Sequence, residues 1–186
     1  MKTTLDEPRL ATIYDQQAIN NLAKELKDWL HTRNTDQWAR PWPTAEEHDE
    51  RIRRNLAANA TWILWDGAVA AATITVHGEG NTALWTGAER REPAVYLHRI
   101  MVSRYYAGQR IGARLIDWAA ARAAAEYGAR QARIDVWTDN TALHAYYTTI
   151  GFTFLRLADC RPDYPSRALF QRPIAVADPP GAPCDR

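Results

Sequence analysis

The sequence predicts a single α/β domain built on a mixed β-sheet. Strand-like and helix-like patterns follow one another in the order strand, two helices, hairpin, strand, helix, strand, helix and two strands. We expect one twisted sheet of about six to seven strands, flanked by about four helices. With 186 residues, of which 46% are hydrophobic, the chain is long enough for one well-packed core.

The first third of the chain supplies a strand and two helices. Alternating apolar residues predict a strand at residues 10–14, and Asp15 is a candidate N-cap for a helix that continues to about His31. Residues 32–43 contain two prolines and cannot form a regular helix. Thr44 and Glu47 resemble a capping box, which predicts that a second helix begins there.

The remaining elements follow from apolar runs separated by turn residues. Residues 61–65 and 68–76 flank the turn Asp66-Gly67 and predict a β-hairpin, followed by a polar loop at residues 77–93. We expect later strands at residues 95–102, 133–137, 152–157 and 168–172, with helices beginning near Ile111 and Asn140. The domain therefore covers residues 1–172, and the Pro-rich residues 173–186 are expected to form a disordered or draped tail.

The turn between the strand at residues 95–102 and the next helix contains two glycines. Its residues are Gly108, Gln109, Arg110, Ile111, Gly112 and Ala113. A glycine-bearing turn before a helix directs free backbone N–H groups and the positive helix end at one point, which suits a phosphate group. The alternative is a simple tight turn with a packing glycine.

Together with the next helix, this turn resembles the signature of the GNAT superfamily of acyl-CoA-dependent N-acetyltransferases. That signature is a strand, the turn Gln/Arg-x-x-Gly-x-Gly/Ala, a helix, a strand and then Asn-x-x-Ala-x-x-x-Tyr-x-x-x-Gly-Phe. The chain matches it at Asn140, Tyr147, Gly151 and Phe152, and in the turn it keeps Gly112 and Ala113. It departs from the family pattern at three positions: Leu143 replaces the alanine, Ala107 the first Gln or Arg, and Arg110 the first glycine.

The resemblance implies acetyl-CoA as cosubstrate, bound where the strand before the turn separates from its parallel neighbour at a bulge. The backbone of Ile100, Met101 and Val102 would then contact the pantetheine arm and the thioester carbonyl, and the turn from Gly108 to Ala113 would hold the pyrophosphate. Asn140 is expected to cap its helix and to contact the cofactor. For Arg110 the alternatives are a backbone that needs glycine and a guanidinium that contacts phosphate, and we expect the second.

The resemblance also implies catalytic roles. Tyr147 matches the family tyrosine that is proposed to protonate the leaving thiolate. His98 stands near the position where related enzymes place a carboxylate base, and Asp135 on the neighbouring strand could orient its imidazole. The alternatives are a core role for Tyr147, a His98 bonded to a backbone carbonyl with Asp135 paired to Arg133 or Arg99, and water as the base.

The acceptor is predicted from the two irregular segments that flank the expected pocket. They contain the aromatic residues Trp38, Trp42 and Trp85 and the carboxylates Asp36, Glu79, Glu89 and Glu92. This combination favours a small primary amine with a cationic or apolar body. The alternatives are a protein N-terminus or lysine as acceptor, a non-catalytic acyl-CoA-binding module, and tryptophans that only cover the edge of the core.

Composition excludes several other classes of function. A formal net charge of +1 gives no broad basic face for nucleic acid, and no apolar run approaches membrane length. The two cysteines, Cys160 and Cys184, form neither a disulfide framework nor a metal-binding set, so we expect no metal and a location in the reducing cytoplasm. A homodimer is left open.

Overall fold

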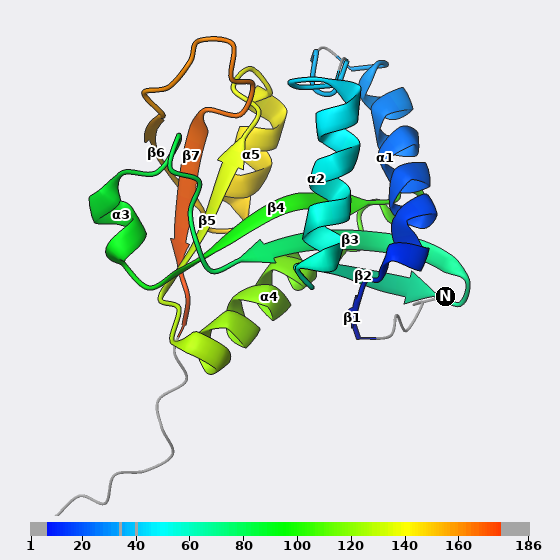
Figure 1. Cartoon of the computed structure of the whole chain (residues 1–186), viewed down its shortest axis with the longest axis horizontal. Coiled ribbons are helices and arrows are strands. Elements are labelled where there is room, and N and C mark those ends of the chain that lie inside the picture. The colour runs from blue at the N-terminus through cyan, green and yellow to red at the C-terminus, as the bar shows by residue number, and fades with distance from the viewer. Residues whose placement is uncertain (1–6, 34, 40, 176–186) are drawn as a thin grey trace, which may run out of the picture.

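The computed structural model describes residues 7–33, 35–39 and 41–175, and Figure 1 shows the arrangement of their helices and strands. The strands are β1 (Arg9–Leu10), β2 (Thr61–Asp66), β3 (Val69–His77), β4 (Ala94–Val102), β5 (Gln131–Val136), β6 (Thr153–Leu157) and β7 (Ala168–Pro173). The α-helices are α1 (Gln16–Leu30), α2 (Ala45–Ala57), α3 (Gly87–Arg91), α4 (Ile111–Tyr127) and α5 (Thr141–Thr149), with 3₁₀ turns η1 (Ile13–Asp15) and η2 (Arg104–Tyr106).

All seven strands form one mixed sheet in the order β1-β2-β3-β4-β5-β7-β6. Only the β4–β5 pairing is parallel; the other neighbouring strands are antiparallel. The predicted fold class, an α/β domain with a mixed sheet, is confirmed.

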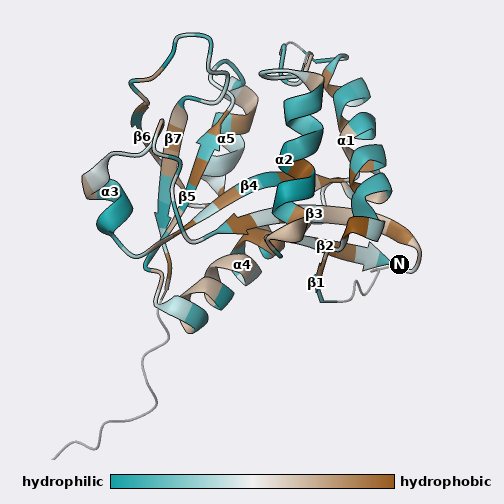
Figure 2. Cartoon of the chain, in the orientation of Figure 1, coloured by the Kyte–Doolittle hydropathy of each residue, from teal (hydrophilic) through white to brown (hydrophobic). Residues whose placement is uncertain are grey.

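Helices cover both faces of this sheet. Helices α4 and α5 pack into the largest apolar cluster, whereas α1 and α2 pack into a separate cluster around Ile63 and Met101. In α1 the buried residues recur at helical spacing (Ile19, Leu22, Leu26 and Leu30), which explains why the sequence pattern predicted this helix. Figure 2 shows α1 and α2 largely hydrophilic outside that stripe and the middle of the sheet largely hydrophobic.

The parallel strands β4 and β5 separate half-way along their length. Their pairing begins at Ala94↔Gln131 and ends at Leu97↔Ile134, although both strands continue beyond it. On its other side β4 pairs Thr75 with His98 and Thr73 with Met101, so β4 contains one more residue than β3 over this interval. That β-bulge includes Arg99, whose φ is +47°. The bulge and the separation, which the family resemblance implied, are therefore present.

Two segments differ from the sequence predictions. The strand predicted at residues 10–14 ends at Leu10 and is followed by η1, because Ile13 and Tyr14 are 53% and 93% exposed and do not alternate into the core. The loop predicted at residues 77–93 contains the short helix α3, which Thr86 and Glu89 begin with a capping box.

The remaining predicted elements are confirmed, with small differences at their ends. The Oγ1 atom of Thr44 accepts the Glu47 N–H of α2 at 3.2 Å, as the capping pattern suggested. β7 extends through Pro173, and the Ile174 N–H donates to the Arg130 carbonyl at 2.9 Å. The rest of the predicted tail, residues 176–186, lies outside the described residues.

Candidate active site

The turn that follows β4 presents unbonded N–H groups at the start of α4. Gly108 and Arg110 have φ values of +79° and +57°, and the side chain of the N-cap residue Arg110 makes no capping bond to the helix. The first bond of the helix runs from the Arg114 N–H to the Arg110 carbonyl at 3.0 Å. The N–H groups of Ile111, Gly112 and Ala113 therefore have no intrahelical acceptor, and together with the positive helix end they can bind an anion.

Arg110 has the backbone conformation that favours glycine, which corrects our expectation for it. Its φ of +57° and ψ of 22° lie in the left-handed region, where a Cβ atom meets the following carbonyl oxygen. The side chain is exposed, and its positive charge opposes the rise in the pKa of Tyr146 that burial causes. The departure from glycine therefore strains the turn and places a cation beside the helix end.

Gly112 lies where α4 approaches α5 closely. A Cβ atom at this position would lie 3.0 Å from the Tyr146 hydroxyl oxygen and 3.5 Å from a methyl carbon of Val102. A larger side chain in this first turn of α4 would therefore meet Tyr146 and Val102.

The part of β4 that separates from β5 has one unpaired edge. Met101 is 1% exposed and pairs with Thr73 of β3, while Ile100 and Val102 pack against the cluster that includes α4. No ladder pair with β5 is formed beyond Leu97. The backbone of residues 100–102 can therefore pair with an extended ligand that enters between the strands.

Tyr147 lies in the aromatic core but its hydroxyl is not bonded locally. It is 8% exposed and packs edge-to-face against Phe152 at a centroid distance of 5.6 Å. Within the described part of the chain the hydroxyl has no hydrogen-bond partner, and burial, with the nearby Tyr146 and Asp135, raises the pKa of Tyr147 above that of a free phenol. The hydroxyl is therefore protonated at neutral pH, as a proton donor must be, and is a weaker acid than a free phenol.

The structure brings His98 and Asp135 together. The Nδ1 atom of His98 lies 3.1 Å from Oδ1 of Asp135, and their side chains are 26% and 13% exposed. That oxygen still has no aligned donor among the described residues, so the pair is close without forming a well-directed hydrogen bond. The His98 ring also lies 5.5 Å from that of His77, whose pKa is lowered by burial and by His98.

Asp135 does not pair with Arg133 or Arg99, the two alternative partners that the sequence left open for it. Arg133 donates to the Tyr96 hydroxyl and pairs with Glu92, and Arg99 contacts His48. Asp135 is therefore not engaged by an arginine in the described part of the chain.

Asn140 is confirmed as the cap of α5. Its Oδ1 accepts the Leu143 N–H at 3.0 Å, while its Nδ2 donates to Oε1 of Gln37 at 2.6 Å. Both ends of the amide are thus bonded within the protein. The bond to Gln37 connects the start of α5 to the α1–α2 loop. A further hydrogen bond, which Trp137 Nε1 donates to Asp36 Oδ1 at 2.7 Å, connects the same loop to the segment before α5.

The three tryptophans that we predicted to line an acceptor pocket do not share one environment. Trp85 is 1% exposed and packs against Tyr96 in the core, which corrects its assignment as a residue that contacts substrate. Trp38 is partly buried against the cluster below α1 and α2. Trp42 is half-buried, and its ring centroid lies 4.4 Å from that of Tyr164 in a tilted arrangement, so Trp42 stays a candidate.

Most of the carboxylates that we expected to meet a cationic amine already have partners. Glu89 binds Arg156 at 2.6 Å, Glu92 pairs with Arg133, and Asp36 accepts from Trp137. Trp85, Glu89, Glu92 and Asp36 therefore no longer support a cationic acceptor.

No site role was predicted from the sequence for several polar residues that lie on the same side of the sheet as His98. They are His48 and Arg51 of α2, Arg99 of β4, His77 of β3 and Tyr164 of the β6–β7 loop. Burial and then the charge of Asp135 raise the pKa of Tyr164 to about 12. No local sequence signal marks them, since β4, α2 and the β6–β7 loop meet only in the folded chain.

The described residues contain no group of three His, Cys, Asp or Glu side chains that could hold a metal ion. None of the helices in that part of the chain is both long and apolar enough to cross a membrane.

Comparisons with known proteins agree with this geometry. Residues 23–152 match the model of the acetyltransferase (GNAT) family. An uncharacterized N-acetyltransferase, YesJ of Bacillus subtilis (strain 168), is 30% identical over 153 residues, which cover 78% of this chain and 80% of that protein.

Solved structures show the same fold. A GNAT-family acetyltransferase from Listeria monocytogenes aligns with a TM-score of 0.69 and 23% identity over 90% of this chain and 94% of that chain. The PaiA N-acetyltransferase from Thermoplasma acidophilum, crystallised with coenzyme A, aligns with a TM-score of 0.64 and 15% identity over 90% of this chain and 98% of that chain.

Proposed function

The chain belongs to the GNAT family of acetyltransferases, and we propose that it transfers the acetyl group of acetyl-CoA to the primary amine of a small molecule, by direct attack within a ternary complex. One observation carries the proposal: the unpaired edge of β4 leads directly to the uncapped start of α4, with the Tyr147 hydroxyl on the adjacent helix. The neighbour from Thermoplasma acidophilum, which was crystallised with coenzyme A, supports the same cosubstrate for this chain.

The residues of this chain fit acetyl-CoA along its length. The N–H groups of Ile111, Gly112 and Ala113 would bind the pyrophosphate, with the exposed Arg110 beside it. The edge at Ile100 and Val102 would pair with the pantetheine arm, and a backbone N–H there would polarise the thioester carbonyl.

Tyr147 is proposed as the general acid. As the amine nitrogen forms its bond to the carbonyl carbon, the carbon–sulfur bond breaks and the thiolate accepts the Tyr147 proton. The raised pKa of Tyr147 keeps that proton in place at neutral pH, and its unbonded hydroxyl is free to give it up.

The proton that leaves the amine is proposed to pass to His98, directly or through a water molecule. With Nδ1 facing Asp135 at 3.1 Å, the Nε2 atom is available to accept a proton. Asp135 would then stabilise the imidazolium that forms, as carboxylates do in other acid–base pairs.

The loops around the site favour a small acceptor over a protein segment. Trp42 of the α1–α2 loop stacks on Tyr164 of the β6–β7 loop, and the Tyr164 hydroxyl accepts from Asn81 Nδ2 of the β3–β4 loop at 3.0 Å. Three loops therefore contact one another at Trp42 and Tyr164, which supports a small acceptor, because a peptide would need an open groove.

The proposal is tested by a panel of primary amines assayed for release of free thiol from acetyl-CoA, with mass spectrometry of the product. We expect acetylated small amines and no acetylation of peptide N-termini or lysines under the same conditions. Faster transfer to peptides than to every small amine would contradict the small-molecule acceptor. Tight CoA binding without transfer to any acceptor would contradict enzymatic function.

A further inference from the structure

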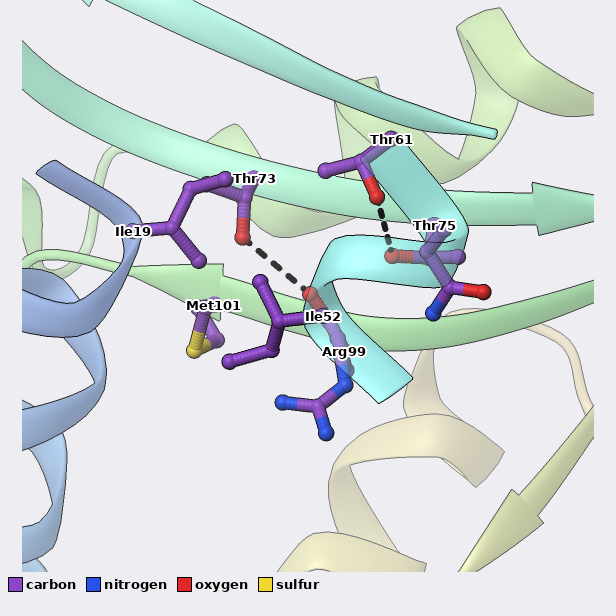
Figure 3. Close-up of a pocket in the computed structure, with 8 residues that line it drawn as sticks. Ile19, Ile52, Thr61, Thr73, Thr75, Arg99 and Met101 are labelled. Carbon is purple, nitrogen blue, oxygen red and sulfur yellow. Dashed lines mark hydrogen bonds between the residues drawn. The ribbon is translucent and has the colours of Figure 1, made fainter. Parts of the chain in front are cut away.

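The bulge in β4 places two neighbouring polar side chains on the same face of the sheet. Successive side chains of a regular strand point to opposite faces, so His98 and Arg99 would normally be separated. Here His98 pairs with Thr75 and Met101 with Thr73, and Arg99 lines the same cavity as these threonines and Met101. Figure 3 shows the guanidinium extending away from both threonines, beside Ile52 of α2. Arg99 therefore lies on the same face of the sheet as His98, the proposed base, and we call this face the acceptor side.

Arg99 has no anionic partner there. Its Nη1 atom is 3.5 Å from Nε2 of His48, and no carboxylate in the described part of the chain forms an ion pair with it. Burial and the positive charge of Arg51 lower the pKa of Arg99 to about 10, and only Asp49 opposes them. A half-buried guanidinium without a counter-ion is costly, and an anionic ligand at this position would offset that cost.

Helix α2 adds two more groups to this position. His48 and Arg51 are three residues apart and so lie on one side of α2, and Arg51 donates to the Trp42 carbonyl at 2.9 Å. Burial, Arg99 and Arg51 lower the pKa of His48 to about 4, so its ring is neutral at physiological pH. The ring adds no charge, and its nitrogen can share a hydrogen bond with the guanidinium.

Most of the charges that converge on this position are cationic, and the exception is Asp49 of α2. Lys27 and Arg51 both lower the pKa of His48 through their positive charge and Asp49 opposes them, while Asp135 lies 3.1 Å from His98. A second cation would be repelled here, whereas a carboxylate can accept two parallel bonds from a guanidinium.

We propose that Arg99, assisted by Arg51, binds a carboxylate of the acceptor, so that the substrate is an amino acid or a related amine with a carboxylate close to its nitrogen. This inference rests on the proposed function and names its substrate class. Arg99 directly precedes Ile100, whose backbone would lie at the thioester. The short distance along β4 favours a carboxylate only a few bonds from the attacking amine.

Matched acceptors test the proposal directly. Each L-amino acid of a panel is compared with its amide and with the amine that lacks the carboxylate, by kcat/KM for thiol release. We expect the acids to exceed their amides by about tenfold or more, the range of a charge-assisted hydrogen bond. The amine of the amide is less basic than that of the acid, so a larger fraction of it is unprotonated and able to attack. This difference alone would favour the amide. A higher kcat/KM for the acid would therefore indicate recognition of its carboxylate.

Variants assign the preference to residues. Arg99→Gln should raise KM for the acids by about tenfold or more and leave KM for the amides and for acetyl-CoA unchanged. Arg99→Lys keeps the charge and should restore part of the preference, and Arg51→Gln should reduce it. The control is Arg53→Gln, because Arg53 is exposed on the same helix and pairs only with Glu50 there.

Three results decide the inference. Equal or better use of the amides by the unmodified enzyme would overturn it, as would an Arg99→Gln variant that slows every acceptor equally. If no amine is acetylated, the proposed function fails. The carboxylate site is then tested by binding alone, with calorimetry in the presence of CoA that compares N-acetyl-L-amino acids with their amides. Tighter binding of the acids that Arg99→Gln abolishes would support the carboxylate site, and equal binding would refute it.

Discussion

Helices α4 and α5 both begin next to the gap between β4 and β5, but they satisfy their first N–H groups differently. In α5 the Asn140 side chain accepts the Leu143 N–H at 3.0 Å. In α4 the corresponding position is Arg110, which has a φ of +57° and gives no side-chain bond to the helix. A side chain thus caps the first N–H groups of α5, and we call this a closed helix start. The first N–H groups of α4 have no such cap from Arg110, and we call this an open helix start.

The difference separates two tasks. The closed start of α5 fixes the helix that holds Tyr147, whose ring packs between Phe152 and Phe170. The open start of α4 keeps its N–H groups for a ligand at the cost of an unfavourable backbone conformation. Substitutions in α4 and α5 can therefore separate these two tasks.

The largest expected effect comes from Gly112→Asp in α4. A carboxylate in front of the free N–H groups would compete for them and repel a pyrophosphate, so we expect CoA affinity to fall by at least about a hundredfold. Calorimetry with CoA measures it.

Gly112→Ala is the control for bulk without charge. Its Cβ would meet the Tyr146 hydroxyl at 3.0 Å, and Tyr146 is 38% exposed and can move. We expect this variant to fold and to lose far less affinity. Unchanged CoA binding by the aspartate variant would remove the pyrophosphate from this turn.

Tyr147→Phe in α5 should lower kcat by about tenfold or more while CoA affinity and thermal stability stay nearly unchanged. The variant removes a hydroxyl that has no partner within the described residues, so little structure is lost. Steady-state kinetics beside a thermal melt separate the two roles. Unchanged turnover with a lowered melting point would make Tyr147 a core residue only.

Much of the fold follows from short-range signals in the sequence. The Asp66-Gly67 turn predicted the β2–β3 hairpin, and the Thr44 cap predicted the start of α2, because both depend on residues within one turn of each other. Helix α3 carried a similar signal, Thr86 with Glu89 three residues later, that the sequence prediction did not use. The strand prediction for residues 10–14 was wrong because alternating apolar residues alone do not show that Tyr14 faces solvent.

The site was predictable only where a local motif carries it. The spacing from Asn140 to Gly151 marked Tyr147, whereas Arg99 reaches the acceptor side through a bulge that exists only in the register with β3. Tyr164 joins the site through a loop that meets Trp42, more than a hundred residues earlier in the chain. Trp85 was misassigned because its place between Tyr96 and Arg133 depends on packing under α3.

Asn140→Ala tests the closed start of α5. Loss of the bond to the Leu143 N–H should cost about 1 kcal/mol of stability, the usual value of a helix cap. Asn140→Asp keeps the accepting oxygen but removes the donor to Gln37, so it should retain most of the cap. Denaturant unfolding compares the variants. A fall in CoA affinity in both variants at unchanged stability would instead assign Asn140 to the cofactor.

The smallest effect is expected at the open start of α4, from Arg110→Gly. A side chain at a φ of +57° costs about 1–2 kcal/mol, and the greater freedom of unfolded glycine returns about 0.4–1 kcal/mol. We therefore expect the variant to be more stable by up to about 1.6 kcal/mol, measured by denaturant unfolding. The neighbouring exposed Gln109 has no positive φ, so Gln109→Gly should only destabilise.

The same Arg110→Gly variant shows why the strain persists. If the guanidinium contacts the pyrophosphate, the more stable variant should bind CoA more weakly, and the loss should shrink as salt screens the charge. Lys or Gln at position 110 would keep the strained backbone, and only Lys would keep the charge. Equal CoA affinity in the Gly, Gln and Lys variants would show that the cation beside the helix start has no part in binding, and the open N–H groups alone would account for the anion site.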